Sequence, residues 1–216
     1  MNQDKIKKII LIGYSGHSYV VADILSIMKL DANFYCDSEE KLNNPFQLTY
    51  LGKEADFLAS NLYLNNRDNW QTFVGIGDNN IREKVFNLLV DKNAHIINAI
   101  HPKTIIAASA IFGKGVMIAA NTTINPLCKI GNGVICNTSS SIDHECIIDD
   151  FAHIAPGAVL CGNVKIGKRT FIGANAVIKQ GISICNDVKI GAGACVVKNI
   201  TEPGIYIGNP AKLLIK

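Results

Sequence analysis

The sequence predicts an α/β plus all-β protein, in which a small Rossmann-like N-terminal parallel-sheet domain is followed by a left-handed parallel β-helix of hexapeptide repeats. Two observations support this prediction. An apolar residue recurs at every sixth position through the second half of the 216-residue chain, whereas the first half alternates short apolar runs with stretches of helical periodicity. We expect the first domain to span residues 1–98 and the second to span residues 99–216.

The six-residue repeat runs from Ile106 to Val196 without an insertion, and fourteen of its sixteen apolar positions are Ile, Leu or Val. A small or β-branched residue lies two positions before each of them. A strand this short cannot bury its apolar side alone and does so by stacking on the coil beneath it. Because three hexads make one triangular coil, residues eighteen apart stack and residues nine apart lie half a coil from each other.

The first domain begins with an apolar run, Lys8–Ile12, that predicts a strand, and a glycine-containing turn connects it to a helix over residues 20–28. Two further strands are predicted over Asn33–Cys36 and Thr72–Ile76, and the second of them precedes a helix over Asn80–Val90. Alternating strands and helices predict a small parallel sheet. The expected apolar face of the last helix comprises Ile81, Val85, Leu88 and Leu89.

The composition excludes several classes of protein. With 48% hydrophobic and 18% charged residues the chain is globular, and a net charge of +3 with scattered basic residues argues against nucleic acid or an anionic membrane as partner. The first apolar run is too short for a signal peptide or a membrane span, so we expect a cytoplasmic protein. Seven cysteines are an odd number, and Cys128, Cys136 and Cys146 occupy inward repeat positions, which indicates reduced structural thiols.

Three segments of the first domain follow predicted strands directly: Ser15–His17, Asp37 and Gly77. Ligands of parallel sheets bind beyond the carboxyl ends of the strands, where glycine turns and helix N-termini present N–H groups to phosphate. The first turn lacks the full three-glycine fingerprint, so a purely structural turn is an equal alternative. His17 is better explained as a neutral histidine that hydrogen-bonds a ligand, because a helix N-terminus disfavours its charged form.

In the repeat, His144 is followed by Glu145, and a histidine beside a carboxylate on a rigid scaffold can act as a general base near neutral pH. A surface histidine in a turn is the alternative interpretation. His144 and His153 differ by nine positions and face different sides of the prism, while His101 shares no clean register with either. One chain is therefore not expected to form a three-histidine metal site. The nearest thiol, Cys146, lies at an inward position and is not expected to act as a nucleophile.

Several motifs occur together with the repeat. They are Ser15-Gly16-His17, Asn137-Thr138-Ser139-Ser140, Asp143-His144-Glu145-Cys146, His153, Gly157, Gly162-Asn163-Val164-Lys165-Ile166-Gly167 and the ending Gly208-Asn209-Pro210-Ala211-Lys212. Across essentially the whole chain they closely resemble the NeuD/PglD family of sugar O- and N-acyltransferases. The chain looks most like members that use acetyl-CoA to acetylate the 4-amino group of a UDP-linked 4-amino-4,6-dideoxy sugar, on the route to diacetylbacillosamine.

This resemblance implies roles for individual residues. His144 becomes the proton acceptor and Glu145 the residue that raises its basicity. His153 falls on a position that contacts acetyl-CoA, and Ala174 and Ala192 fall on backbone contact positions for the same co-substrate. The implied nucleotide-sugar side comprises Ser15, Gly16, His17, Cys36, Asp37, Gly77 and Asn137. Relatives carry an acidic pair where this chain has Cys36-Asp37, which leaves Asp37 alone to accept a hydrogen bond from uracil or ribose.

The resemblance also implies a homotrimer with active sites between adjacent subunits, and acetyl-CoA as co-substrate without a metal ion. His144 of one subunit and His153 of a neighbour would then line one cleft. Within the family, O-acetylation of a sialic acid and N-acetylation of GDP-perosamine are the alternatives. Outside it, the alternatives are a zinc enzyme of the carbonic anhydrase type and a non-enzymatic scaffold whose first domain senses a nucleotide sugar.

Overall fold

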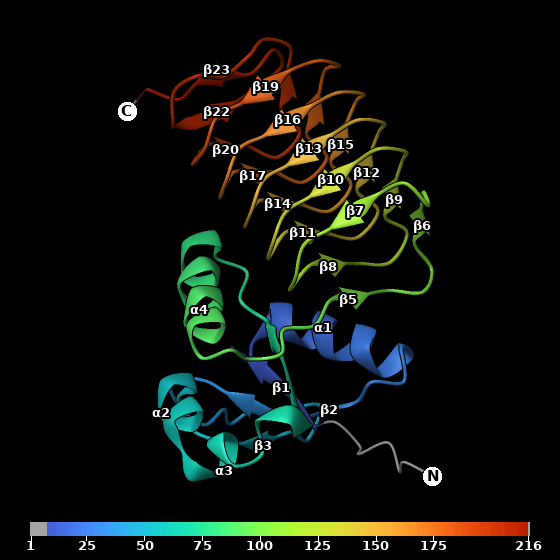
Figure 1. Cartoon of the computed structure of the whole chain (residues 1–216). Coiled ribbons are helices and arrows are strands. Elements are labelled where there is room, and N and C mark those ends of the chain that lie inside the picture. The colour runs from blue at the N-terminus through green and yellow to red at the C-terminus, as the bar shows by residue number, and fades with distance from the viewer. Residues whose placement is uncertain (1–7, 216) are drawn as a thin grey trace. The chain divides into compact units, whose positions relative to one another are not determined.

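The structure is a computed structural model that describes residues 8–215 and divides into two compact units, Met1–Ala99 and Ile100–Lys216 (Figure 1). The first unit contains a four-stranded parallel sheet with helices, and the second is a stack of short parallel strands. The fold class predicted from the sequence is confirmed in both halves of the chain.

The sheet of the first unit has the strand order β3-β2-β1-β4. Its strands are β1 (Lys8–Ile12), β2 (Ala32–Cys36), β3 (Thr49–Tyr50) and β4 (Trp70–Val74). The helices are α1 (Gly16–Ile27), α2 (Glu54–Ala59), α3 (Asn61–Leu64), the 3₁₀ helix η1 (Arg67–Asn69) and α4 (Asn79–Asp91). Strand β1 is central and buried over Ile9–Ile12, which agrees with its continuous apolar run. The predicted strands and helices are present, although β4 ends at Val74 rather than at Ile76.

Helix α4 buries a face that agrees with the predicted one at Val85 and Leu89 but not at Ile81. Ile81 is 53% exposed, whereas Arg82, Val85, Phe86 and Leu89 are buried. Two apolar stripes, offset by one position, satisfy the helical period equally well here, so periodicity alone could not choose between them. The buried face contains an arginine because its guanidinium group hydrogen-bonds main-chain carbonyl groups.

The second unit consists of three sheets along the sides of a prism, with parallel strands throughout the repeat (Figure 1). The five-stranded sheet contains β7 (Ile111–Phe112), β10 (Lys129–Ile130), β13 (Ile147–Ile148), β16 (Lys165–Ile166) and β19 (Ser183–Ile184). The six-stranded sheet contains β6 (Ile105–Ile106), β9 (Thr123–Ile124), β12 (Ser141–Ile142), β15 (Val159–Leu160), β18 (Val177–Ile178) and β21 (Cys195–Val196). The eight-stranded sheet contains β5 (Ala99–Ile100), β8 (Met117–Ile118), β11 (Ile135–Cys136), β14 (His153–Ile154), β17 (Phe171–Ile172), β20 (Lys189–Ile190), β22 (Ile205–Ile207) and β23 (Lys212–Leu213).

Within the repeat, each strand pairs with the strand eighteen residues later, as Lys129 does with Ile147, so the predicted stacking register is confirmed. The sixth-position residues from Ile118 to Val196 are buried and form one continuous core. Ile106 and Phe112 are only partly buried because they belong to the first coil and lie at the end of the stack. Every coil turns three corners, and side chains at these corners and on the outer side of the strands are exposed.

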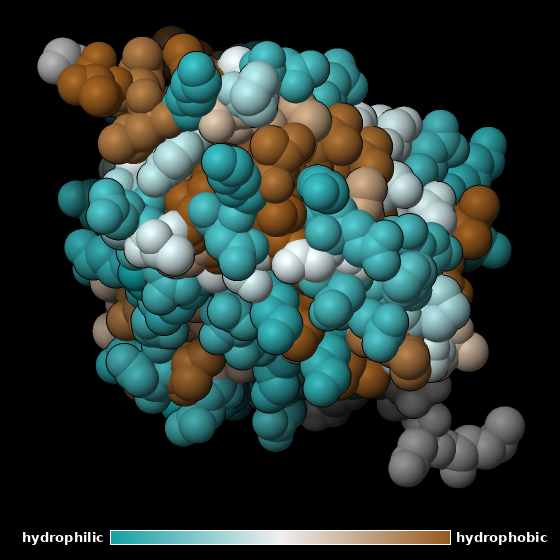
Figure 2. Space-filling view, turned by 90° about the horizontal axis from the view of Figure 1, so that it is seen from above, coloured by the Kyte–Doolittle hydropathy of each residue, from teal (hydrophilic) through white to brown (hydrophobic). Residues whose placement is uncertain are grey.

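The last coil is followed by a tail that extends the eight-stranded sheet. Strand β22 pairs in parallel with β20, and β23 pairs antiparallel with β22. Figure 2 looks onto this end of the molecule, where apolar side chains lie among hydrophilic ones. The partly exposed apolar residues of the tail are Ile205, Ile207, Leu213, Leu214 and Ile215. Among the described residues, no helix has the length and apolar character that crossing a membrane requires.

Candidate active site

His144 and Glu145 lie at the corner between the six-stranded and the five-stranded sheets, in the turn between β12 and β13. Their side chains are 48% and 57% exposed. The His144 Nδ1–H donates to Glu145 Oε2 at 3.1 Å. A hydrogen bond this exposed adds little to stability. It does orient the ring, because a donor at Nδ1 leaves the lone pair of Nε2 directed away from the carboxylate.

The backbone of this corner is held by the coils below and above it. Asp143 Oδ1 accepts the His144 N–H at 2.8 Å and the Asn125 side-chain amide at 2.9 Å. The Glu145 N–H donates to the Pro126 carbonyl, and the His144 carbonyl accepts from Asn163. The base candidate is therefore exposed but rigidly mounted.

The imidazole ring of His144 lies across Gly162, the residue eighteen positions later. A Cβ atom at position 162 would lie 2.5 Å from His144 Cε1 and 2.6 Å from Nε2. Any side chain there would displace the ring. The absence of a side chain at Gly162 is thus a requirement for the observed position of the imidazole.

Cys146 is fully buried inside the β-helix, and its thiol donates to the Cys161 carbonyl at 3.2 Å. A hydrogen bond with Cys128 and burial both raise the pKa of Cys146 well above its ordinary value. A thiol that is protonated and enclosed cannot attack a substrate, so the structure agrees with the expectation that Cys146 is not a nucleophile.

His153 and Asn137 lie together on the eight-stranded sheet and the corner that follows it. Asn137 Oδ1 accepts the Thr138 N–H at 2.8 Å, which directs Asn137 Nδ2 toward His153 Nε2 at 3.3 Å. The His153 ring also packs edge-to-face on Phe171, with 5.0 Å between ring centroids. Phe171 is not among the site residues predicted from the sequence, although the eighteen-residue register places it directly above His153.

The two alanines assigned to the co-substrate lie along the same edge of the prism as Asn137. Ala174 and Ala192 occupy the turns that follow β17 and β20, and the Ala174 carbonyl accepts the Gly193 N–H. Because alanine side chains are small, the main-chain groups of this edge lie near the surface. His144 belongs to a different corner of the prism. One chain therefore brings together Asn137, His153, Ala174 and Ala192 but not His144.

In the first unit, the residues assigned to the nucleotide sugar gather at the carboxyl ends of β1, β2 and β4. The Gly13 N–H donates to the Cys36 carbonyl at 2.8 Å, and the Tyr14 N–H donates to Asp37 Oδ2 at 2.8 Å. A Cβ atom at Gly77 would lie 3.8 Å from the Cβ atom of His17. The two hydrogen bonds join the turn after β1 to the end of β2, and the turn after β4 lies beside His17.

Cys36 and Asp37 are less accessible to a ligand than the sequence suggested, because one is buried and the other already accepts hydrogen bonds within the protein. The Cys36 side chain is fully buried, and burial, followed by the charges of Glu54 and Asp37, raises its thiol pKa to about 12. The Asp37 carboxylate also accepts from the N–H and hydroxyl of Ser38, and it pairs with Lys41 at 3.2 Å. Burial alone would raise the Asp37 pKa, but these hydrogen bonds outweigh it and lower the pKa.

His17 is neutral at pH 7. Burial, and secondarily the positive charge of Arg82, lower its pKa to about 4. Sequence analysis expected a neutral histidine from the helix dipole, whereas the structure gives burial and Arg82 as the causes. A neutral imidazole can donate from one nitrogen and accept at the other.

The two long helices that begin at this edge differ at their N-termini. Asp78 caps α4, and its carboxylate accepts from the N–H groups of Asn80 and Ile81. Ser15 stands at the N-cap of α1, but its side chain forms no capping hydrogen bond. The first turn of α1 is therefore the better anion-binding end, because its N–H groups are not opposed by a carboxylate.

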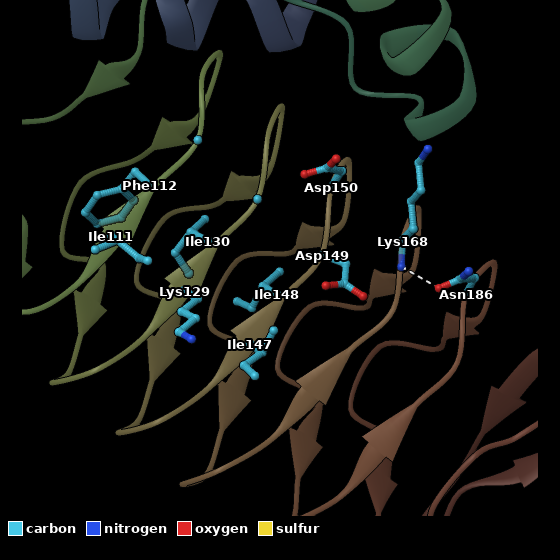
Figure 3. Close-up of a pocket in the computed structure, with 12 residues that line it drawn as sticks. Ile111, Phe112, Lys129, Ile130, Ile147, Ile148, Asp149, Asp150, Lys168 and Asn186 are labelled. Carbon is cyan, nitrogen blue, oxygen red and sulfur yellow. Dashed lines mark hydrogen bonds between the residues drawn. The ribbon is translucent and has the colours of Figure 1, made fainter.

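A groove of about 520 Å³ lies on the outer side of the five-stranded sheet and the corner that follows it. Figure 3 shows Ile111 and Ile147 on the strands of this groove and Asp150 and Lys168 on the corner beside them, where the Lys168 main-chain N–H donates to Asn186 Oδ1 at 2.8 Å. None of the residues that sequence analysis assigned to a site lines this groove. Within residues 8–215, no three His, Cys, Asp or Glu side chains form a group that could hold a metal ion.

The two units match different family models. The PglD N-terminal domain matches residues 8–89, the bacterial transferase hexapeptide (six repeats) matches residues 145–180, and the hexapeptide repeat of succinyl-transferase matches residues 163–198. A curated relative, the GDP-perosamine N-acetyltransferase of Escherichia coli O157:H7, is 33% identical over 105 residues. That match covers 49% of this chain and 48% of the relative, so it spans about half of the relative's length.

Solved structures match over both units. The acetyltransferase domain of PglB from Neisseria gonorrhoeae FA1090 is 30% identical, with coverage of 96% of this chain and 100% of that chain and a TM-score of 0.87. PerB from Caulobacter crescentus, solved in complex with CoA and GDP-perosamine, is 30% identical, with coverage of 97% and 98% and a TM-score of 0.89. The similarity thus extends through the N-terminal sheet, the β-helix and the tail.

Proposed function

This chain belongs to the NeuD/PglD family of sugar acyltransferases, and on that premise we propose that it is an acetyl-CoA-dependent N-acetyltransferase. Its acceptor is the 4-amino group of a nucleotide-linked 4-amino-4,6-dideoxy sugar. The observation that carries this proposal is the His144–Glu145 pair, an exposed and rigidly mounted imidazole whose Nε2 is available to take a proton. Relatives that match over both units support the substrate class, since one of them was solved with CoA and GDP-perosamine.

The reaction is a direct transfer. The neutral 4-amino nitrogen attacks the thioester carbonyl carbon, and the nitrogen proton passes to His144 Nε2 as the tetrahedral intermediate forms. The C–S bond then breaks, and the CoA thiolate leaves with the proton from His144. General-base assistance contributes roughly 10²- to 10⁴-fold, and holding amine and thioester together can remove about 7–11 kcal/mol of the barrier. No covalent enzyme intermediate is required.

We further propose that the active site lies between adjacent subunits of a homotrimer. His144 stands at one corner of the prism, whereas Asn137, His153, Ala174 and Ala192 stand along another. Neighbouring prisms in a ring present different edges to each other, because a ring uses heterologous contacts. One subunit then supplies the base, and its neighbour supplies the edge on which acetyl-CoA lies.

The nucleotide binds the first unit in this proposal. The open N-terminus of α1 receives the diphosphate, and neutral His17 hydrogen-bonds the ligand. We propose a UDP-linked sugar on the resemblance to the diacetylbacillosamine route. A GDP-linked sugar is the second candidate, and the relatives that act on GDP-perosamine favour it.

The test is a panel of 4-amino nucleotide sugars, UDP-linked and GDP-linked, incubated with acetyl-CoA. Thiol release measures turnover, and mass spectrometry measures the gain of one acetyl group. We expect one panel member to be acetylated on nitrogen. Acetyl-CoA that is not consumed with any amino sugar, or a product acetylated on oxygen, would contradict the proposal.

Replacing Gly162 by alanine should lower turnover by roughly 10²-fold, because the new methyl group displaces the His144 ring and misplacing a catalytic group by about 1 Å has effects of that size. The measurement is kcat at saturating substrates. Gly181→Asn is the matched control, since that glycine lies at the same corner, one coil further on, with open space around it and a φ of +73° that asparagine tolerates. Equal kcat values for both variants would show that Gly162 does not position the base.

Removing residues 1–98 should separate two binding capabilities. The core of the second unit is built from its own stacked coils, so the fragment of residues 99–216 should fold and bind acetyl-CoA. It should lose tight binding of the nucleotide sugar. Calorimetry with both ligands on both chains makes the comparison, and equal nucleotide-sugar affinity of the fragment would remove the roles of Ser15, His17, Asp37 and Gly77.

A further inference from the structure

Arg82 is a buried arginine in the first turns of α4 and is only 1% exposed. Its guanidinium group donates hydrogen bonds to the turn between β4 and α4 and to the first residue of α4. Nη1 donates to the carbonyl oxygens of Ile76 at 3.1 Å and Gly77 at 2.9 Å, and Nη2 donates to Asn79 Oδ1 at 2.7 Å. The side chain thus folds back over the residues that precede its own helix.

A buried arginine is a costly choice for stability alone. Taking its charge out of water has a free-energy cost of several kcal/mol, and well-packed apolar side chains of similar volume often stabilise a core as well or better. Burial of Arg82 lowers its pKa to about 9, and the nearby Asp78 opposes that shift. The guanidinium group still carries its charge at pH 7, so an explanation beyond packing is needed.

The burial of Arg82 is explained by the backbone segment that its guanidinium group holds, Ile76–Gly77. Gly77 lies beside His17, because a Cβ atom added at Gly77 would come within ordinary van der Waals distance, 3.8 Å and 3.9 Å, of the Cβ and Cγ atoms of His17. Both residues belong to the proposed nucleotide-sugar site. Arg82 therefore hydrogen-bonds the main chain of one wall of that proposed site.

We propose that Arg82 is a positioning residue of the nucleotide-sugar site, which holds the Ile76–Gly77 backbone against the imidazole of His17. The role in ligand binding rests on the proposed function. Arginine suits this task because its planar fork bridges separate acceptors, whereas a lysine ammonium is a single point donor. Its charge has a second effect, since it adds to burial in keeping His17 neutral.

Two variants distinguish the hydrogen-bonding geometry of the Arg82 guanidinium group from its positive charge. Arg82→Lys keeps the charge but cannot bridge the carbonyl groups of Ile76 and Gly77, and Arg82→Met removes both. Arg67→Met is the matched control, because Arg67 belongs to the same unit but precedes β4 at the opposite end of the strand. Calorimetry measures the dissociation constants of UDP and GDP for the full chain, and NMR of labelled histidine measures the His17 pKa without ligand.

We expect both Arg82 variants to weaken binding of the preferred nucleotide by at least about tenfold, in line with the loss of hydrogen bonds from a charged donor. The His17 pKa should stay near 4 in Arg82→Lys and rise in Arg82→Met, although burial, the larger cause of its lowering, still keeps it below its ordinary value of 6.5. The affinity of both Arg82 variants for acetyl-CoA should be unchanged. The Arg67→Met variant should keep the nucleotide affinity and the His17 pKa of the unsubstituted chain. Circular dichroism identifies a variant that has lost its fold. If Arg82→Met does not fold, the nucleotide affinity of Arg82→Lys decides whether the proposal holds.

The proposal would be overturned if Arg82→Lys and Arg82→Met both kept the nucleotide affinity and the His17 pKa of the unsubstituted chain. Failure of the proposed function has a different signature, namely that the unsubstituted chain binds neither UDP nor GDP. In that case the His17 pKa of the ligand-free variants still decides whether Arg82 acts on His17. A pKa near 4 in a folded Arg82→Met variant would then reject that action.

Discussion

Replacing His144 by alanine should remove nearly all acetyl transfer while leaving the fold and the oligomeric state intact. The side chain is 48% exposed and contributes nothing to the buried core of the β-helix. Its loss removes the proton acceptor, and general-base effects are about 10²- to 10⁴-fold. We therefore expect kcat at saturating substrates to fall by at least about 10²-fold, whereas binding of both substrates stays nearly unchanged.

Two further variants test whether the loss is specific. Glu145→Gln keeps the size of the side chain but removes the carboxylate that orients His144, so its kcat should fall less than that of His144→Ala. His95→Ala removes an exposed histidine of the first unit that no predicted site includes, and it should leave kcat unchanged. A His144→Ala enzyme that retained more than about a tenth of wild-type kcat would not have lost its base.

Mixing two inactive variants should restore activity if the site lies between subunits. His144→Ala removes the base, and His153→Trp fills the space beside Asn137 and Phe171 where acetyl-CoA is proposed to lie. Each homotrimer should be nearly inactive. In randomly assembled hybrids, a site is intact when a chain with a good His144 adjoins a chain with a good His153. Half of the chains meet each condition, so about one quarter of the sites should work.

Co-expression is required, because β-helix trimers need not exchange subunits after folding. A second mixture gives the control: wild-type chains co-expressed with chains that carry both substitutions. Shared sites predict about one quarter of full activity in both mixtures. Sites within one chain predict about half in the control mixture and none in the first. The first mixture showing no more activity than its parents would reject a shared site.

Periodicity made the second unit predictable in detail. A repeat of six without an insertion determines which residues point inward and which stack, and Lys129 pairs with Ile147 eighteen positions later as expected. The same arithmetic places His144 and His153 on different sides of the prism. A β-helix is predictable in this way because every contact of its core is between residues at a constant separation.

The first unit was predictable only in outline. Its strands β1, β2 and β4 and its helices α1 and α4 follow from apolar runs and helical spacing, whereas β3, α2 and α3 carry no periodic signal strong enough to separate them from loops. The end of β4 at Val74 also escaped prediction, because Gly75 and Ile76 continue the apolar run beyond the last ladder position.

By itself, the sequence determined the two-domain fold, the register of the β-helix, and the positions of the histidines on separate faces. Only the tertiary structure decided that Arg82 rather than Ile81 faces the interior, that Gly162 leaves room for the His144 ring, and that Asp37 is already hydrogen-bonded. The physical reason is the range of the interactions. Periodicity reports which side of an element is apolar, but it carries no information about hydrogen bonds and close approaches between side chains and turns, and those arise only when separate segments meet.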